Sequence, residues 1–246
     1  MTVHSILQFL VLAQEAKTQT ELATEFEAVL KGYGFGYYGV WMKSQSLGYL
    51  DSTTLWGRWP DGWQETYAVK KFGLVDPTIR MLAVAQRPFR WRDAISMFRS
   101  DPNRKRIQRM MQDASRNGLN DGYTFPIHGR NGLLGHVSIG GPVTDLSPAE
   151  LTMFDAAAKK MFWRTLELSG QIGLFEAIKS VETTLTRRET EVLYLLAEGM
   201  TSHEIAKALT ISNHTVDWYI NAIQEKFEAN NRQHVVAIAF RLGLVS

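Results

Sequence analysis

Hydrophobic positions follow helical and strand spacing through the first two-thirds of the chain. The capping box Thr18-x-x-Glu21 begins a predicted helix whose apolar face is formed by Leu22, Phe26, Val29 and Leu30. Residues 37–42 alternate as a strand, with Tyr37, Gly39 and Trp41 on one face. Such alternation predicts a sheet with one face toward a core.

Four further elements follow before residue 169. Asp101-Pro102 opens a predicted helix that ends at Gly118, and two strands are expected at 122–127 and 132–140. Ser147-Pro148 then caps a long helix that reaches Leu166. This order of helices and strands predicts an α+β domain over residues 1–169, with helices packed on an antiparallel sheet.

The pattern changes to pure helix after residues 170–183, where two glycines and little periodicity predict a linker. Capping boxes at Thr186 and Thr201 begin two helices, and a tight turn follows at 210–212. A third helix carries one apolar stripe, formed by Val216, Ile220, Ile223 and Phe227. A fourth is expected at 233–242. Residues 184–246 are therefore predicted to form an all-α domain of four helices.

Composition narrows the class of protein. The 246 residues are 45% hydrophobic and 21% charged, as in soluble globular proteins with room for two cores. There is no cysteine, and the six histidines lack ligand spacing, so we expect no metal and no cofactor. No apolar run approaches the ~20 residues of a membrane span. The apolar stretch 5–13 lacks the flanks of a signal peptide, so a cytoplasmic protein without membrane contact is expected.

The C-terminal helices have the geometry of a helix-turn-helix, in which the second helix enters the major groove. Its outer face offers amide and imidazole groups that match base edges, from Asn213, His214, Asn221 and Gln224. A plain helical bundle with a solvated face is the alternative. The charge balance favours that alternative, because residues 176–246 hold 7 Lys and Arg against 9 Asp and Glu.

Ordered motifs weigh against the plain bundle. Leu185-Thr-Arg-Arg-Glu189, Glu198-Gly199 with Glu204-Ile-Ala206, and Ile211-Ser212-x-x-Thr215-Val216 together closely resemble the LuxR-type helix-turn-helix. The resemblance and the helix geometry predict DNA contacts by Thr201, Ser202, Asn213, His214, Thr215, Asp217, Trp218, Asn221 and Arg232. Met200 and Asp217 depart from the family pattern, and an acid in the DNA-reading helix leaves the preferred DNA sequence open.

Aromatic and polar residues gather in the N-terminal part as Trp59-Pro-Asp-Gly-Trp63-x-x-x-Tyr67, then Asp76-Pro77-Thr78, Trp91 and Gly122. Rings hold the apolar body of a small ligand, and a few donors and acceptors hold its polar atoms. Asp76 would accept an amide N–H. For any one of these residues, a place in the core or in a cap is the simpler interpretation.

The ordered set resembles the autoinducer-binding domain that precedes LuxR-type DNA-binding modules. That family folds as an α-β-α sandwich and binds N-acyl homoserine lactones. The resemblance implies that Trp63 donates to the lactone carbonyl, Asp76 accepts the ligand amide and Trp91 packs on the ring. The same resemblance implies that Tyr67 lines the pocket and that Ser138, with Thr78, lies near the acyl carbonyl and amide. Gly122 would let a strand approach closely.

Two bulky rings suggest a restricted acyl channel. Trp59 stands where a Tyr often donates to the acyl carbonyl, and Trp41 lies on a strand that lines the channel in the family. We therefore expect short, branched or aromatic acyl groups to be preferred over long chains.

The family pattern also implies a homodimer, with the helix from Pro148 as candidate interface, bound to a palindromic promoter. A regulator of another small molecule, or of none, remains an alternative. An enzyme is not expected, because Gly34-x-Gly36-x-x-Gly39 lies between helix and strand in the wrong order for a dinucleotide site. Ser138 likewise lies outside a nucleophile elbow.

Overall fold

The chain folds into two compact units, Met1–Gln171 and Ile172–Ser246. The computed structural model describes residues 2–43, 52–129, 132–171 and 185–245. Most of the linker predicted over 170–183 lies outside the described residues. In the described residues no helix combines the length and the apolar character needed to cross a membrane.

The first unit is built on a five-stranded sheet in the order β2-β1-β5-β4-β3. Every neighbouring pair is antiparallel, as the alternation predicted. The strands are β1 (Tyr37–Lys43), β2 (Ser52–Arg58), β3 (Phe89–Arg90), β4 (Asp121–Gly129) and β5 (Gly132–Gly141). The register sets Gly39 opposite Ser138 and Trp41 opposite His136, which places these residues at the centre of the sheet.

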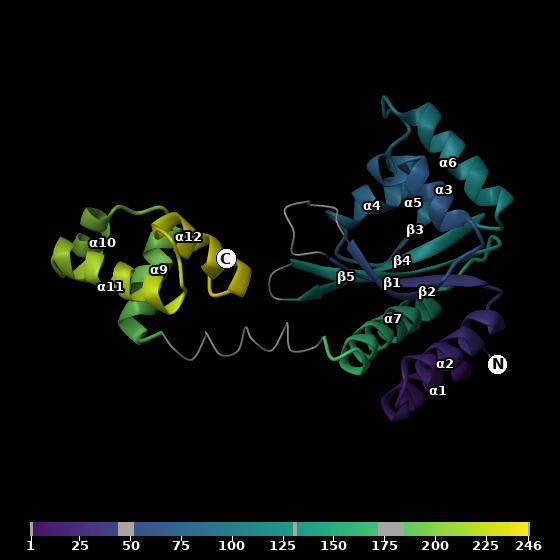
Figure 1. Cartoon of the computed structure of the whole chain (residues 1–246), viewed down its shortest axis with the longest axis horizontal. Coiled ribbons are helices and arrows are strands. Elements are labelled where there is room, and N and C mark those ends of the chain that lie inside the picture. Colours follow the sequence, from purple (N-terminus) through teal and green to yellow (C-terminus); the bar gives the residue numbers. More distant parts are fainter. Residues whose placement is uncertain (1, 44–51, 130–131, 172–184, 246) are drawn as a thin grey trace. The chain divides into compact units, whose positions relative to one another are not determined.

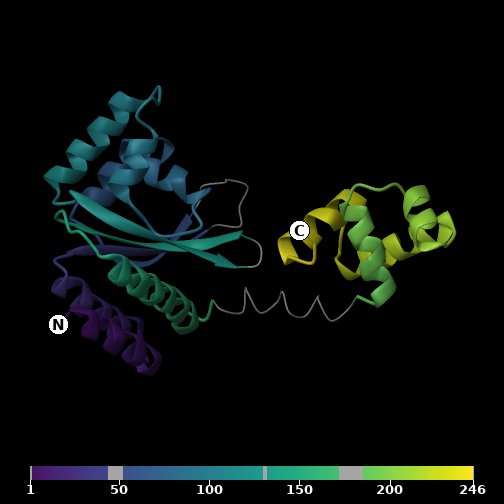
Figure 2. The same ribbon diagram turned by 180° about the vertical axis from the view of Figure 1, so that it is seen from behind.

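Helices cover both faces of the sheet (Figures 1 and 2). One layer contains α1 (Thr2–Glu15), α2 (Gln19–Gly32) and α7 (Pro148–Leu168). The other contains α3 (Trp63–Val69), the 3-10 helix η1 (Phe72–Leu74), α4 (Pro77–Leu82), α5 (Trp91–Met97) and α6 (Arg104–Arg116). The α-β-α sandwich is thereby confirmed.

The two layers differ in how tightly they pack. Between the sheet and α1, α2 and α7 the core is closed, with Phe26, Tyr38, Phe154 and Phe162 wholly buried. Rings of Phe26 and Tyr38 meet edge to face at 5.4 Å between centroids. Such burial contributes about 25 cal/mol per Å² of apolar surface, so this layer stabilises the unit. The opposite layer is hollow.

One predicted boundary is wrong by a few residues. The helix expected to open at Asp101-Pro102 begins at Arg104. The Asp101 carboxylate instead accepts from the Asn103 N–H at 2.7 Å and pairs with Arg80 of α4. Asp101 therefore ties a turn to a neighbouring helix instead of capping α6.

The second unit has the four predicted helices, α9 (Arg187–Ala197), α10 (Ser202–Leu209), α11 (Asn213–Lys226) and α12 (Arg232–Leu242). Its core is formed by apolar faces of all four, including Val192, Ile205, Val216, Ile223 and Val235. The expected turn after α10 is made by Thr210 in the left-handed conformation, at φ 56°.

Candidate functional site

A cavity of about 770 Å³ lies between the sheet and the layer of α3 to α6. Its volume falls in the usual range for small-molecule sites. Eight of the nine residues predicted to bind a ligand line it, namely Trp41, Trp59, Trp63, Tyr67, Asp76, Thr78, Trp91 and Ser138. The ninth, Gly122, lies beneath the ring of Trp91 and supports the lining.

Helix α3 presents Trp63 and Tyr67 on one face, as their spacing predicts. Gly62 precedes the helix at φ 72°, a conformation that glycine adopts without strain. Trp63 is 7% exposed, and its indole N–H has no hydrogen-bond partner among the described residues. An unpaired donor on the wall of a cavity is available to a ligand acceptor.

Asp76 is the buried acceptor of the site. It caps α4, and its Oδ1 accepts from the Thr78 N–H at 2.8 Å and from the Thr78 hydroxyl at 2.7 Å. Its Oδ2 accepts from the Tyr67 hydroxyl at 2.8 Å, which leaves that oxygen a second lone pair. Burial raises the pKa of Asp76, while the hydrogen bonds from Thr78 and Tyr67, and a backbone interaction with Ile79, act to lower it. The carboxylate can therefore accept one further N–H.

Trp91 lies flat on two glycines of the sheet. A β-carbon at Gly122 would come within 2.7 Å of its ring, and one at Gly140 within 2.4 Å. A β-carbon at Gly122 would also lie 2.2 Å from the carbonyl oxygen of Ile139 on the adjacent strand, as expected for close strand approach. Only glycine at both positions leaves room for the indole.

The indole N–H of Trp91 begins a chain of hydrogen bonds. It donates to the Thr124 hydroxyl at 3.0 Å, which lies 2.9 Å from the Ser138 hydroxyl. When Thr124 donates to Ser138, the hydrogen of Ser138 remains free to point into the cavity. Thr124, 1% exposed, was not predicted from sequence.

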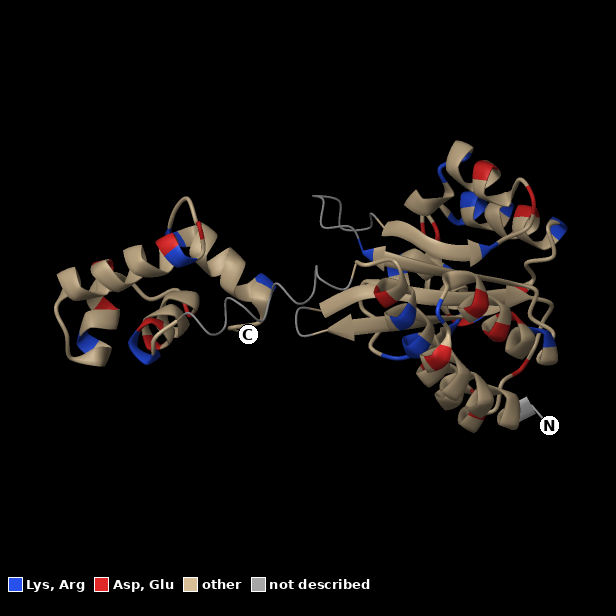
Figure 3. Cartoon of the chain, turned by 60° about the horizontal axis from the view of Figure 1, so that its bottom comes forward, with Lys and Arg blue, Asp and Glu red and all other residues tan. Residues whose placement is uncertain are grey.

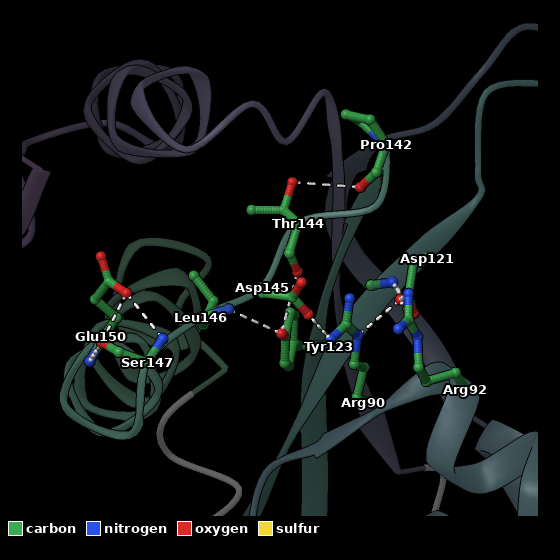
Figure 4. Close-up of polar contacts among 11 residues, drawn as sticks. Arg90, Arg92, Asp121, Tyr123, Pro142, Thr144, Asp145, Leu146, Ser147 and Glu150 are labelled. Carbon is green, nitrogen blue, oxygen red and sulfur yellow. Dashed lines mark hydrogen bonds and ion pairs between the residues drawn. The ribbon is translucent and has the colours of Figure 1, made fainter.

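The residues beside Trp91 hold its backbone in place. Arg90 and Arg92 both donate to Oδ2 of buried Asp121, through their Nε atoms at 2.7 and 2.8 Å (Figure 4). Asp121 Oδ1 accepts from the Gly122 N–H at 2.9 Å. Arg90 also pairs with Asp145, four residues after β5 ends at Gly141 along the strand-to-helix connection. This clamp fixes the start of α5 against β4.

A row of rings forms another wall. His136 stacks on Trp41 with ring centroids 4.7 Å apart and planes 12° apart, and Trp41 lies 5.6 Å from Trp59. Trp59 in turn lies 6.4 Å from Trp91. The Trp41 ring folds over Gly39, where a β-carbon would come within 2.3 Å of it. Trp59 Nε1 is buried and has no partner within the described part of the chain.

His136 is a lining residue that sequence reasoning missed. It is 5% exposed, and burial lowers its pKa to about 3, so the imidazole is neutral at physiological pH. Its position two residues before Ser138 on a strand was a usable signal, because such residues share one face. Asp121 and Thr124 could have been sought in the same way, as neighbours of Gly122.

The second unit is held together across its helices by a buried ion pair. Glu189 caps α9, accepting from the Thr186 N–H at 2.6 Å, and both its oxygens accept from Lys226 Nζ at 2.6 and 2.8 Å. Glu189 is 3% exposed. Lys226 is the last residue of α11, so this ion pair joins the end of α11 to the start of α9.

The predicted base-reading residues share one exposed face of α11. Asn213, His214, Asp217, Trp218 and Asn221 are all exposed there. Trp218 is 60% exposed, which is unusual for an indole without a partner surface. Thr215 is partly buried, because its hydroxyl lies 2.7 Å from that of Ser212 at the N-cap.

Three of the residues predicted to contact DNA, Thr201, Ser202 and Arg232, already have partners in the protein. The Thr201 hydroxyl donates to Glu204 at 2.7 Å, and the Ser202 hydroxyl donates to Asp217 at 2.7 Å. Arg232 begins α12 and reaches the Met200 carbonyl at 3.4 Å. Lys and Arg are interspersed with Asp and Glu along the ribbon of this unit (Figure 3).

Comparisons with known proteins place both units. Residues 18–165 match the autoinducer binding domain, and residues 183–239 match the bacterial regulatory proteins of the luxR family. The chain is 32% identical over 226 residues to RpaR of Rhodopseudomonas palustris, an HTH-type quorum sensing-dependent transcriptional regulator, covering 91% of this chain and 88% of RpaR. It is 29% identical over 220 residues to the quorum-sensing regulator RhlR of Pseudomonas aeruginosa, covering 89% and 87%.

Solved structures share the fold. Escherichia coli SdiA superposes with a TM-score of 0.61 and 24% identity, covering 97% of each chain. CepR2 of Burkholderia cenocepacia gives a TM-score of 0.51 and 20% identity, covering 70% of this chain and 99% of its own.

A small-molecule cavity in one unit and a helix-turn-helix in the other define a ligand-responsive transcriptional regulator. The chain belongs to the luxR family of regulators with an autoinducer-binding domain, and it is a quorum-sensing transcriptional regulator. The relatives that it matches are regulators of transcription, not enzymes.

Proposed function

We propose that the cavity of this regulator binds an N-acyl homoserine lactone and that occupancy controls promoter binding by the helix-turn-helix. The observation that carries the proposal is the pairing of one unpaired donor, Trp63 Nε1, with one incompletely used acceptor, Asp76 Oδ2, on the same cavity. An acyl homoserine lactone offers the complementary pair, a ring carbonyl that accepts and an amide N–H that donates.

The remaining lining residues fit the same ligand. The face of Trp91 would cover the lactone ring, and the Ser138 hydroxyl, with Thr78, would meet the acyl carbonyl and amide. Tyr67 would hold Asp76 in place through its 2.8 Å bond. Trp59 would gain a partner for its buried N–H from the acyl carbonyl if its ring turned toward the ligand.

The acyl group would lie along Trp41 and Trp59, whose neighbouring rings, tilted by 44° to each other, narrow the cavity. Short, branched or aromatic acyl groups would therefore bind better than long straight chains. Equal affinities for a short and a long straight-chain lactone would contradict this preference.

The fold by itself admits more than one ligand class. CepR2 is N-acylhomoserine lactone dependent, whereas one complex of SdiA contains octanoyl-rac-glycerol. The lactone proposal therefore depends on the donor and acceptor of the site. A different small molecule, or none, is the competing outcome of the experiment.

The experiment is thermal unfolding of the full chain with a panel of acyl homoserine lactones. A ligand that binds only the folded protein raises its stability by RT ln(1 + [L]/Kd), about 2.7 kcal/mol at a hundredfold excess over Kd. Trp63→Ala and Asp76→Ala should abolish this stabilisation. Stabilisation that persists in both variants, or that no lactone produces, would overturn the proposal.

For the output, we propose that residues 1–169 bind the ligand and residues 184–246 bind DNA as a homodimer, with α7 as candidate interface. Two copies of α11 would meet half-sites of a palindromic promoter about one helical turn apart. Asn221→Ala should weaken promoter binding and leave lactone affinity unchanged, because Asn221 is exposed on α11. Loss of both properties would contradict a division of labour between the units.

A further inference from the structure

His136 occupies the next position along the cavity floor after the residues assigned to the ligand head. On β5, the ring of Trp91 packs against Gly140. Ser138 and then His136 follow at two-residue steps on the same face of the strand, and both line the cavity. Each two-residue step along a strand is about 6.8 Å. A ligand whose ring lies on Trp91 and whose acyl carbonyl meets Ser138 therefore extends its acyl group toward His136.

The imidazole is held rigidly and its nitrogens are unused. Its face is stacked on Trp41 at 4.7 Å, which leaves only the ring edge available for hydrogen bonds. No hydrogen bond to either ring nitrogen occurs within the described parts of the chain. A neutral imidazole carries one donor and one acceptor, and leaving buried polar atoms unpaired costs free energy. A purely hydrocarbon acyl group would leave that cost in place.

Polar side chains also lie beyond Trp41, on the neighbouring strand β2. Strand β1 lies between β5 and β2, and Thr54 of β2 is paired with Trp41 in the sheet register. Thr54 and its neighbour Ser52 line the same cavity. This end of the cavity therefore presents hydroxyl and imidazole groups beside an indole face, where a channel for an alkyl tail would present aliphatic side chains.

We propose that His136 is a specificity-determining residue that selects signals whose acyl group carries a hydrogen-bonding substituent, such as a hydroxyl, one strand step beyond the acyl carbonyl. A hydroxyl both donates and accepts, so it can pair with either nitrogen of the neutral ring. The inference depends on the proposed lactone function and adds the chemistry of the acyl end.

The test compares two ligands that differ by one oxygen, N-hexanoyl and N-(6-hydroxyhexanoyl) homoserine lactone, by titration calorimetry on the full chain. The wild-type protein should bind the hydroxylated ligand about fivefold to tenfold more tightly, the ratio that one net hydrogen bond supplies. His136→Phe keeps a ring to stack on Trp41 and removes both nitrogens, so the two affinities should become equal within about twofold.

Two further variants keep the test decisive. His136→Ala enlarges the cavity and should also lose the preference, which covers the case in which Phe does not fit. Thr54→Val removes a hydroxyl from the same cavity at nearly constant volume and should reduce the preference less than His136→Phe does, which separates the imidazole from the hydroxyl beside it. A wild-type protein that binds both ligands equally, or a His136→Phe protein that keeps the preference, overturns the role of His136 alone. Failure of both ligands to bind overturns the lactone proposal together with it.

Discussion

The indole of Trp91 lies where a side chain of Gly122 would be. A β-carbon on Gly122 would come within 2.7 Å of that ring and 2.2 Å of the Ile139 carbonyl oxygen. The floor of the cavity is thus an aromatic ring seated directly on backbone. The site depends on the absence of a side chain as much as on the ring itself.

Gly122→Ala should therefore displace Trp91 and strain the pairing of β4 with β5. We expect a loss of about 2 kcal/mol or more in the free energy of unfolding, in the range of overpacked cores, and loss of ligand stabilisation. Urea unfolding followed by tryptophan fluorescence measures the first effect. Gly32→Ala is the control, because nothing lies within 4 Å of a β-carbon there. Equal stability of both variants would contradict the steric argument.

Asp76→Asn separates ligand binding from folding. Burial raises the pKa of Asp76, so its ionised form is a cost to the folded state at neutral pH, and a neutral amide removes that cost. We expect the unliganded variant to be at least as stable as wild type at pH 7. Its Nδ2 hydrogens would oppose the ligand N–H, so lactone affinity should fall at least tenfold, a difference of about 1.4 kcal/mol.

Asp155→Asn provides the matched control for this experiment. Asp155 lies on α7, on the other face of the sheet, where it pairs with Lys159 at 2.6 Å. The lactone affinity of the Asp155→Asn protein should equal that of wild type. A similar loss of affinity in both variants would show that Asp76 acts on stability and not on the ligand.

Local signals in the sequence predicted much of the fold. The capping boxes at Ser147, Thr186 and Thr201 form as predicted, because the hydroxyl and the carboxylate involved lie within one turn. Strand alternation placed the central strands for a similar reason. By contrast α1 has apolar residues on its exposed side too, including Leu7 and Val11, so no periodicity marked it as a helix.

The parts of the site that escaped prediction depend on distant partners. Thr124 matters because it lies between Trp91 and Ser138, which are far from it in sequence. Asp121 matters because two arginines from other elements, Arg90 of β3 and Arg92 of α5, converge on it. Short helices such as α4 are likewise held by contacts that propensity does not describe. The family resemblance could identify the aromatic residues that line the cavity. The stacking of their rings and the register of the strands could not be deduced from the spacing of residues in the sequence.

Lowering the pH should reduce the stability of the first unit, because His136 is buried in its neutral form. Burial lowers its pKa to about 3 in the folded protein, against 6.5 for the free side chain. As pH falls below 6.5, the unfolded chain binds a proton that the folded protein does not, so stability decreases. Between pH 7.5 and 5.5 the loss should be about 1.4 kcal/mol, and the slope cannot exceed about 1.4 kcal/mol per pH unit.

The His136→Gln variant isolates this effect from other titrating groups. The difference in free energy of unfolding between wild type and variant should change by about 1.4 kcal/mol across that pH interval, in favour of the variant at low pH. A difference that stays constant with pH would mean that His136 titrates normally in the folded protein.

The ion pairs that Arg90 and Arg92 form with Asp121 should contribute more to the free energy of unfolding than an exposed ion pair does. Asp121→Asn leaves Arg90, whose side chain is 13% exposed, without its buried carboxylate. Loss of one partner of a buried pair costs about 3 kcal/mol or more. Asp113→Asn removes the partner of half-exposed Lys70 and should cost less than about 1 kcal/mol. Urea unfolding of the two variants gives the comparison, and equal losses would show that burial does not strengthen the clamp.

In the second unit, Glu189 joins the start of α9 to the end of α11. Burial acts to raise the pKa of Glu189, but bonds from Lys226 and Thr186 outweigh it and lower the pKa overall. Its stabilisation is therefore present above the ordinary glutamate pKa and lost as pH falls through the lowered value. Glu189→Gln should cost about 3 kcal/mol, because the Lys226 charge loses its buried partner.

Glu204→Gln is the matched control, because Glu204 forms the same capping box at α10 with its carboxylate exposed and no ion pair among the described residues. It should cost only about 1 kcal/mol, the value of a helix cap. Amide hydrogen exchange resolves the two units, so protection should fall in α9 and α11 of Glu189→Gln while the sheet of the first unit stays protected. Equal loss of protection in the two variants would mean that the cap, and not the lysine, supplies the stability.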